Sequence, residues 1–205
     1  METPQDIFKG TDIILASKSP RRRELMSMTG LEFSIAETID VDESYVESDL
    51  NGYNVPEFLS LKKARAYQPL LSPGQVLITA DTVVVLGDRI LGKPSNDDEA
   101  KRMLADLSGK THKVITGITL SDVVDVHTFS ATTEVTFSEL TEAEICYYVD
   151  RFHPVDKAGA YGIQEYIGAI GVERIEGSFY NVMGLPVHRL YRELEAFVSR
   201  LSPKK

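Results

Sequence analysis

Two serines and three arginines lie close together in a segment whose composition suits the binding of an anion. Ser17 and Ser19 precede Arg21, Arg22 and Arg23. The arginines would fall in the first turn of a helix, although the positive end of the helix dipole favours acidic residues there. A bound phosphate or carboxylate would explain them, because backbone N–H groups, hydroxyls and guanidinium groups all donate to its oxygens. The alternative is that the arginines are solvated or pair with surface acids.

A carboxylate interrupts the apolar, β-rich stretch 76–86, at Asp81. Burying a carboxylate there costs free energy unless the group caps a turn, pairs with a charge or meets a cation. A general base or a metal ligand would suit this place, and an Asp that binds turn amides is the alternative. Three further acids, Asp40, Asp42 and Glu43, offer oxygen ligands for a hard cation such as Mg²⁺, unless they only form a solvated face.

Two glycine-containing segments carry further polar candidates. The segment 87–94 matches seven of the eight positions of a Walker A loop, but Pro94 stands where Ser or Thr is required. Proline offers neither a hydroxyl nor a backbone N–H, so we expect this segment to connect a strand to a helix, with Lys93 still able to reach an anion. In 159–164, the amide of Gln164 can both donate to and accept from a nucleobase, and a simple glycine turn is the alternative.

The histidines and the cysteine favour neither a metal site nor a thiol enzyme. The four histidines lie far apart in the sequence, and Cys146 falls inside a predicted amphipathic helix. A single cysteine cannot form an internal disulfide, and the first residues include acids where a signal peptide would need an apolar core. We therefore expect a reducing, cytoplasmic location.

The framework expected around these groups alternates strands with helices. Strands are predicted at 13–16, at 76–80 and 83–86 (two strands or one bent strand), and at 113–120, 123–126 and 128–137. Helices are predicted after a Ser19 N-cap and up to Gly30, from Pro56 to Gln68, from a Ser95 N-cap to Gly109, from a capping box at 141–144, and over the apolar stripe 187–201. The segment 152–184 is glycine-dense and is expected to be irregular. The fold class is α/β with a mixed sheet.

Composition limits the classes of protein. With 205 residues, of which 42% are hydrophobic, we expect a soluble globular chain of one domain over residues 1–205, with its core at about 13–200 and a frayed tail at 202–205. The net charge of −9 disfavours binding to nucleic acid or to an acidic membrane. No apolar run approaches the roughly 18 residues of a membrane span.

Several sequence blocks, taken together and in order, closely resemble one family. They lie at 15–25, 80–84, 91–94, 107–112, 156–164 and 181–186. The resemblance is to the Maf family of nucleoside triphosphate pyrophosphatases, which are also called septum-formation inhibitors. It covers about residues 13–200 and is more specific than any single short motif.

The resemblance implies hydrolysis between the α and β phosphates of a nucleoside triphosphate, giving the monophosphate and pyrophosphate with a divalent metal, Mg²⁺ or Mn²⁺. It implies a Maf- and inosine-triphosphatase-like fold: an elongated mixed sheet with flanking helices and two lobes around a central cleft. A homodimer is expected by analogy with the family. The form of residues 158–164 is similar to the branch that acts on dTTP and UTP, rather than the branch that acts on 7-methyl-GTP.

The resemblance also assigns roles to residues. Asp81 matches the catalytic aspartate, as proton acceptor. The substrate-specificity positions are matched by Arg21, Thr82 and Gln164, and other polar positions near the cleft by Ser17, Lys63 and Lys93. We predict Asp81 and Asp42 as the metal ligands, although the acidic segment matches the family only with a one-residue shift. Because a triphosphate carries about four negative charges, a protein of net charge −9 must offset them locally with its basic residues and a metal.

Two alternatives stay open at this point. One is a pyrophosphatase for other or modified nucleotides, of the inosine triphosphate or 7-methyl-GTP type. The other is a noncatalytic nucleotide-binding regulator of cell division, which would bind a triphosphate without releasing pyrophosphate.

Overall fold

The computed structural model describes residues 4–44 and 54–201. Along the chain, its elements are η1 (Pro4–Phe8), β1 (Asp12–Ala16), α1 (Pro20–Ser27), β2 (Ser34–Ile35), α2 (Val55–Tyr67), η2 (Gln68–Leu70), β3 (Gln75–Leu86), β4 (Arg89–Leu91), α3 (Asp97–Leu107), β5 (Thr111–Ser121), β6 (Val126–Phe137), α4 (Glu142–Phe152), η3 (Ala158–Ala160), α5 (Tyr166–Gly171), β7 (Val172–Glu176), α6 (Phe179–Met183) and α7 (Val187–Leu201). The expected mixture of helices and strands is confirmed.

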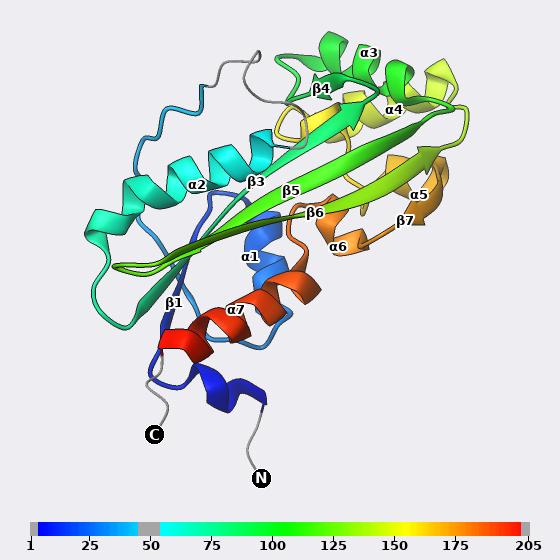
Figure 1. Cartoon of the computed structure of the whole chain (residues 1–205). Coiled ribbons are helices and arrows are strands. Elements are labelled where there is room, and N and C mark those ends of the chain that lie inside the picture. The colour runs from blue at the N-terminus through cyan, green and yellow to red at the C-terminus, as the bar shows by residue number, and fades with distance from the viewer. Residues whose placement is uncertain (1–3, 45–53, 202–205) are drawn as a thin grey trace.

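The described strands form one mixed sheet of seven strands. Six of them follow the order β2-β1-β3-β5-β6-β7, and β4 pairs with the far end of β3. β1 runs parallel to β2 and β3, whereas the other pairs are antiparallel. The long strands β3, β5 and β6 give the sheet its elongated shape (Figure 1).

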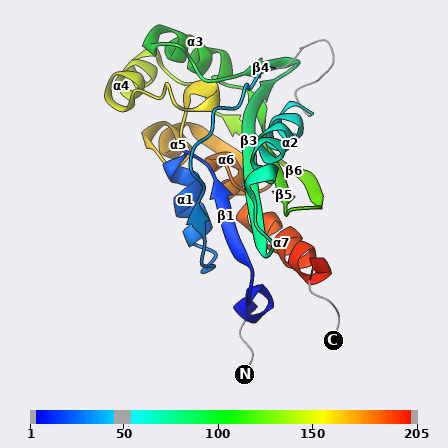
Figure 2. The ribbon, with the colours of Figure 1, turned by 90° about the vertical axis from the view of Figure 1, so that its left-hand side faces the viewer.

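Helices cover both faces of the sheet. α2 packs on β3 and β5 over a small apolar core, and α6 and α7 pack on the other face beside the main core. Figure 2 shows α1 and α2 on opposite sides of β1 and β3. At one end of the sheet, α3, α4, α5 and β4 gather into one lobe, while β1, α1 and α7 belong to the other (Figure 1). The two lobes expected from the sequence are therefore present. Among the described residues, no helix is both long and apolar enough to cross a membrane.

The N-cap residues predicted from the sequence are confirmed for two helices and corrected for a third. Ser19 caps α1, and Thr141 opens α4 with a complete capping box, as predicted. The prediction of Ser95 as the N-cap of α3 is wrong by one residue. Asn96 is the N-cap, and its side chain accepts from the N–H of Glu99 at 2.9 Å. Asn caps a helix as well as Ser does, because it also offers a side-chain oxygen acceptor.

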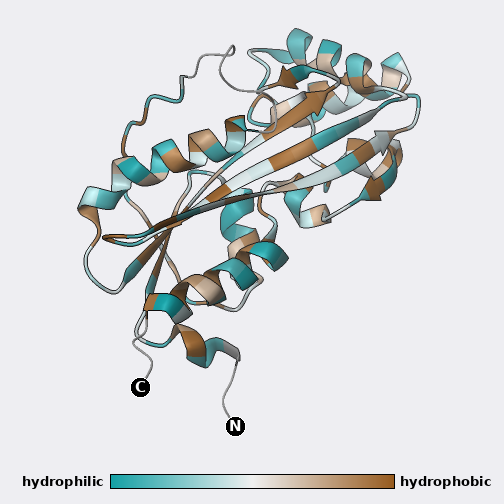
Figure 3. Cartoon of the chain, in the orientation of Figure 1, coloured by the Kyte–Doolittle hydropathy of each residue, from teal (hydrophilic) through white to brown (hydrophobic). Residues whose placement is uncertain are grey.

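The apolar stripe predicted for the last helix is confirmed. α7 buries Leu190, Leu194, Phe197 and Val198 against the main core. Its polar and apolar residues alternate along the ribbon in Figure 3, as they do along α2. This pattern is that of a helix with one face on a sheet and the other in water.

Two sequence expectations about strands and loops need correction, and one open alternative is decided. The stretch 76–86 is one continuous strand, which is one of the two forms expected for it. The segment 123–126 is not a separate strand. Instead, the backbone turns there between β5 and β6, since the Asp122 carboxylate accepts from the N–H groups of Val124 and Asp125. The segment 152–184 is not irregular throughout, because it contains η3, α5, β7 and α6. The tail 202–205 lies outside the described residues.

Gly117 allows α2 to lie directly against the sheet. This residue of β5 is the register partner of Asp81 on β3. A Cβ at Gly117 would lie 2.3 Å from both the carbonyl carbon and the oxygen of Pro56, at the start of α2. Only glycine permits this approach, and the approach places one side of α2 over the middle of β3.

Gly117→Ala therefore tests how the helix is positioned. The added methyl meets rigid backbone, so we expect the free energy of unfolding to fall by about 3 kcal/mol, near the upper end of overpacking penalties. Urea unfolding monitored by circular dichroism measures it. Gly92→Ala is the matched control, because a Cβ there meets nothing within 4 Å. Equal stability of the two variants would contradict the close approach.

Candidate functional site

A cavity opens beside β3, where one edge of that strand is not paired with another strand. β1 pairs with β3 as far as Ala16 and Thr79, and β4 begins to pair at Val84. Within the described residues, the edge from Ala80 to Val83 has no strand partner on that side. Ligands of open α/β sheets bind at the carboxyl ends of parallel strands, and β1 ends at this point.

Segments far apart in the sequence form the wall of this cavity. Its volume is about 410 Å³, within the range of small-molecule sites, about 300–1,000 Å³. The wall is built from the β1–α1 loop with the first turn of α1, residues between 36 and 43, two residues of α2, the middle of β3, Lys93, residues between 156 and 164, and residues 182–184. The first turn of α1 thus points its N-terminal end at the cavity, as the expected anion site requires.

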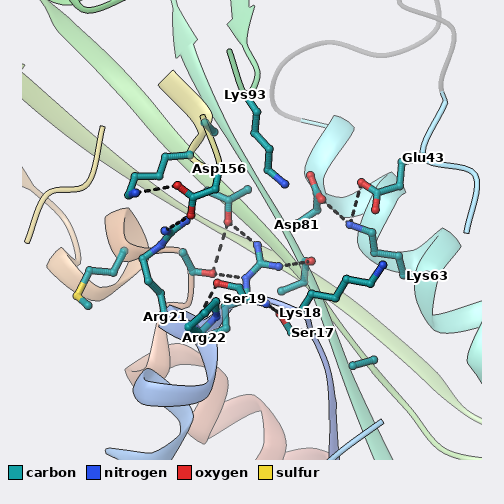
Figure 4. Close-up of a pocket in the computed structure, with 18 of the residues that line it drawn as sticks. Ser17, Lys18, Ser19, Arg21, Arg22, Glu43, Lys63, Asp81, Lys93 and Asp156 are labelled. Atoms are coloured by element: carbon teal, nitrogen blue, oxygen red, sulfur yellow. Dashed lines mark hydrogen bonds and ion pairs between the residues drawn. The ribbon is translucent and has the colours of Figure 1, made fainter. Parts of the chain in front are cut away.

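Lys63 holds two carboxylates at one point of the wall. Its Nζ lies 2.6 Å from the Asp81 carboxylate and 3.3 Å from that of Glu43 (Figure 4). The side chains of Lys63 and Asp81 are only 16% and 15% exposed, so water screens this pair weakly. Asp81 is therefore satisfied by a cation and not by turn amides.

Arg22 ties three parts of the wall together. Its guanidinium donates to the carbonyl of Ala80 at 2.8 Å, to Thr82 Oγ1 at 3.0 Å and to the carbonyl of Gly184 at 2.8 Å. Burial lowers the pKa of Arg22, and the charge of Asp81 acts in the opposite direction. A side chain of α1 thus caps the edge of β3 where no strand pairs with it.

Arg21 is held from the opposite side of the cavity. Its guanidinium donates to the Asp156 carboxylate at 2.8 Å, and Lys157 donates to the same carboxylate at 2.7 Å (Figure 4). Burial raises the pKa of Asp156, but the hydrogen bonds from Lys157 and Arg21 outweigh it, so the net pKa is lowered. The arginines of the first turn are therefore not simply solvated, although Arg23 is exposed.

Two lysines bring unpaired positive charge to the cavity. Lys18 and Lys93 both line it, and neither has a carboxylate partner among residues 4–44 and 54–201. In Figure 4 the Lys93 side chain extends toward Asp81, and the Lys18 side chain extends toward the side where Lys63 lies. Ser17 also lines the cavity, and its hydroxyl accepts from the N–H of Ser19 at 3.2 Å. These groups suit an anion carrying several negative charges.

The structure brings most of the predicted site residues together. The cavity wall includes Ser17, Arg21, Lys63, Asp81, Thr82, Lys93 and Gln164. Asp42 does not line the cavity. Its carboxylate accepts from the N–H and the hydroxyl of Ser44 and from Lys62, and these contacts lower its pKa to about 2.

The sequence did not single out four other wall residues: Glu43, Arg22, Asp156 and Lys157. Glu43 was considered only together with Asp40 and Asp42 as a possible cation ligand, and its contact with Lys63 depends on how its segment lies against α2. Arg22 belongs to the arginine run, where nothing in the sequence distinguishes the inward side chain. Asp156 and Lys157 lie in a matched block, and their contacts with each other and with Arg21 appear only in three dimensions.

Two carboxylates of the wall are the candidate oxygen ligands for a divalent cation. Asp81 and Glu43 both contact the Lys63 ammonium, at 2.6 and 3.3 Å, so their side chains lie on the same side of the cavity. The described residues contain no cluster of three or more His, Cys, Asp or Glu arranged for a metal. Two carboxylates completed by water and substrate oxygens are the usual environment of Mg²⁺.

The chain thus combines an α/β fold with a cavity at the end of its first parallel strand, and more basic than acidic side chains line that cavity, which suits a small anionic ligand. The solved structure of the Staphylococcus aureus Ham1 protein has a similar fold, with a TM-score of 0.50 and 16% identity, covering 94% of this chain and 100% of that one. Residues 12–197 match the family described as Maf-like protein. The chain belongs to the Maf family.

Relatives in this family are similar over nearly their whole length. The dTTP/UTP pyrophosphatase of Bacteroides thetaiotaomicron is 53% identical over 183 residues, which cover 89% of this chain and 94% of that protein. The dTTP/UTP pyrophosphatase of Porphyromonas gingivalis W83 is 48% identical over 194 residues, covering 94% and 97%. The resemblance that the sequence blocks indicated is confirmed.

Arg22→Met tests the cap on the edge of β3. The change leaves three acceptors without their donor, at about 1 kcal/mol each, so we expect a loss of about 3 kcal/mol in the free energy of unfolding. Urea unfolding measures it. Arg23→Met is the matched control, since Arg23 makes one long contact, 3.4 Å to the carbonyl of Ser17. If both variants unfold at the same urea concentration, Arg22 is not a structural cap.

Proposed function

We propose that this chain is a nucleoside triphosphate pyrophosphatase that cleaves dTTP and UTP between the α and β phosphates, releasing the monophosphate and pyrophosphate. The observation that carries the proposal is the Lys63–Asp81 pair in a cavity otherwise rich in basic side chains. Relatives at about half identity that are named for this activity support it.

Asp81 is the base in this mechanism. Its carboxylate takes a proton from a water molecule as that water attacks the α phosphorus. The bond from the α phosphorus to the α–β bridging oxygen breaks, and pyrophosphate leaves with the bond's electron pair. Lys63 fixes the orientation of the Asp81 carboxylate through its 2.6 Å contact, so the base is positioned before substrate arrives.

The basic residues bind and stabilise the phosphates. A protein of net charge −9 repels a triphosphate at long range, and the cavity must overcome this locally. Arg21, Lys93 and the Ser17 hydroxyl donate to phosphate oxygens. Guanidinium and ammonium groups placed where negative charge builds up lower the barrier, because their positions are fixed before the reaction.

A divalent metal, Mg²⁺ or Mn²⁺, fits this site. Asp81 and Glu43 would hold it, and Glu43 takes the place of Asp42 in this proposal because Glu43 lines the cavity and Asp42 does not. When bound, such an ion neutralises phosphate charge and polarises the phosphorus–oxygen bonds.

Gln164 and Thr82 face the same cavity and select the base. Gln164 is exposed, and its side chain has no hydrogen-bond partner among the described residues. A free primary amide can accept from the ring N–H of uracil or thymine and donate to a carbonyl oxygen beside it. Cytosine presents the reversed pattern, an acceptor in the ring and a donor beside it, so an amide held in one orientation discriminates within the pyrimidines.

Three expectations from the sequence stay predictions: one domain over residues 1–205, a homodimer and a cytoplasmic location. The homodimer rests on analogy with the family, and the location rests on the single cysteine.

Asp81→Asn tests the base and the metal. We expect kcat for dTTP with Mg²⁺ to fall by about 100-fold or more, the usual contribution of a general base, while the thermal midpoint stays close to that of the native chain. A coupled assay for pyrophosphate measures it, with an EDTA arm that abolishes turnover and excess Mg²⁺ that restores it. Asp88→Asn, in the exposed turn after β3, is the matched control. A folded Asn variant with near-normal kcat would remove Asp81 as the base.

Gln164→Ala tests base selection. We expect kcat/KM to fall by about tenfold for dTTP and UTP, as when one hydrogen bond is lost, and to change little for ATP and GTP. Initial rates across dTTP, UTP, CTP, ATP, GTP, ITP and 7-methyl-GTP measure it. An unchanged ranking would exclude Gln164 as the selecting residue. A native chain that binds triphosphates without turnover would favour the noncatalytic regulator.

A further inference from the structure

The loop that carries Gln164 is anchored from behind by groups that do not line the cavity. Tyr148 lies on α4 and is fully buried, and Glu165 follows Gln164 directly at the start of α5. Neither residue belongs to the cavity wall, although Tyr161, Gly162 and Gln164 do. The mechanism proposed above uses neither Tyr148 nor Glu165.

The Tyr148 hydroxyl binds the loop at two places. It accepts from the backbone N–H of Gly162 at 3.0 Å and donates to the Glu165 carboxylate. Burial raises the pKa of Tyr148, and the Glu165 carboxylate raises it further. The hydroxyl therefore keeps its proton, and residues on both sides of Gln164 are fixed to one buried group.

Glycine at 162 is what allows this arrangement. A Cβ at Gly162 would lie 2.7 Å from the carboxyl carbon of Glu165. The Glu165 side chain thus folds back beneath the loop, in space that any other residue at 162 would occupy. It makes no capping hydrogen bond to the helix it precedes, because its oxygens are directed to Tyr148 and Lys157.

Lys157 connects this anchor to the phosphate side of the cavity. Its Nζ lies 3.3 Å from Glu165 and 2.7 Å from Asp156, whose other oxygen accepts from Arg21 at 2.8 Å. The side chains of Lys157 and Glu165 are only 9% and 20% exposed, so water screens this pair weakly, whereas the Asp156 side chain is 57% exposed. A continuous chain of contacts joins Tyr148, Glu165, Lys157, Asp156 and Arg21.

We propose that Glu165 is a positioning residue for substrate selection: held by Tyr148 and Lys157, it fixes the loop 162–164 so that Gln164 presents its amide to the base in one orientation. The proposal rests on the proposed function, since it concerns the same cavity. Its consequence is specific. Loss of the Glu165 carboxylate loosens base selection and leaves the Asp81 chemistry in place, because Asp81 is held separately by Lys63.

The test compares Glu165→Ala with Glu165→Gln and Tyr148→Phe. The Ala variant removes both contacts of the carboxylate, whereas Gln keeps an oxygen that accepts from Tyr148, so it should recover most of what Ala loses. Tyr148→Phe keeps the ring and removes only the hydroxyl. Tyr147→Phe is the matched control, because Tyr147 lies on the same helix and is 50% exposed.

Two readouts separate positioning from a merely structural role. Hydrogen exchange of the peptide containing 162–165 should become about tenfold faster in Glu165→Ala and Tyr148→Phe, as expected when one hydrogen bond is lost. The ratio of kcat/KM for dTTP over CTP should fall by about the same factor. The loss should appear as a higher KM for dTTP, while kcat for dTTP stays close to the native value because the Asp81 chemistry is intact. Glu165→Gln should lie near the native chain in both, and Tyr147→Phe should match it.

Two results would overturn the proposal. One is native exchange and native selectivity in Glu165→Ala and Tyr148→Phe. The other is faster exchange with unchanged selectivity, which would make the contacts structural only. If the native chain releases no pyrophosphate, the proposed function fails by itself, and the dissociation constants of dTTP and CTP, measured by calorimetry on the same variants, decide the role of Glu165 separately.

Discussion

The contact between Lys63 and Asp81 is the interaction on which the site depends. It joins α2 to the middle of β3 across 2.6 Å, in a place where water screens charge poorly. The contact requires α2 to lie unusually close to the sheet, and Gly117, the register partner of Asp81, provides that space. Backbone packing on β5 thus determines where a carboxylate on β3 meets its cation.

The basic side chains of the cavity are of two kinds, those paired with carboxylates and those without a carboxylate partner. Some basic side chains are paired with carboxylates, as Arg21 is with Asp156, and these pairs hold segments from different parts of the chain in place. Others, Lys18 and Lys93, have no carboxylate partner among the described residues and leave positive charge for a substrate. An acidic protein can thereby bind a polyanion, because the net charge acts at long range and the cavity acts at contact distance.

Local sequence signals predicted the framework and much of the site. The Ser19 cap, the capping box at Thr141 and the carboxylate of Asp81 in an apolar strand depend on neighbours in sequence, and the structure has all three. The ordered sequence blocks predicted the family and indicated Gln164 as a substrate-specificity residue. All of these signals can be identified from the linear sequence without knowing which distant segments are in contact.

What the sequence could not resolve depends on packing between distant elements. Asp42 and Glu43 are adjacent acids, and only the path of their segment beside α2 decides that Glu43 meets Lys63. Tyr148 lies on α4 and Glu165 directly precedes α5, so no spacing rule connects them.

The most direct test of the proposed activity is phosphorus-31 NMR of dTTP incubated with the protein and Mg²⁺. We expect signals of dTMP and pyrophosphate to grow together. Signals of dTDP and inorganic phosphate, or an unchanged spectrum, would contradict it.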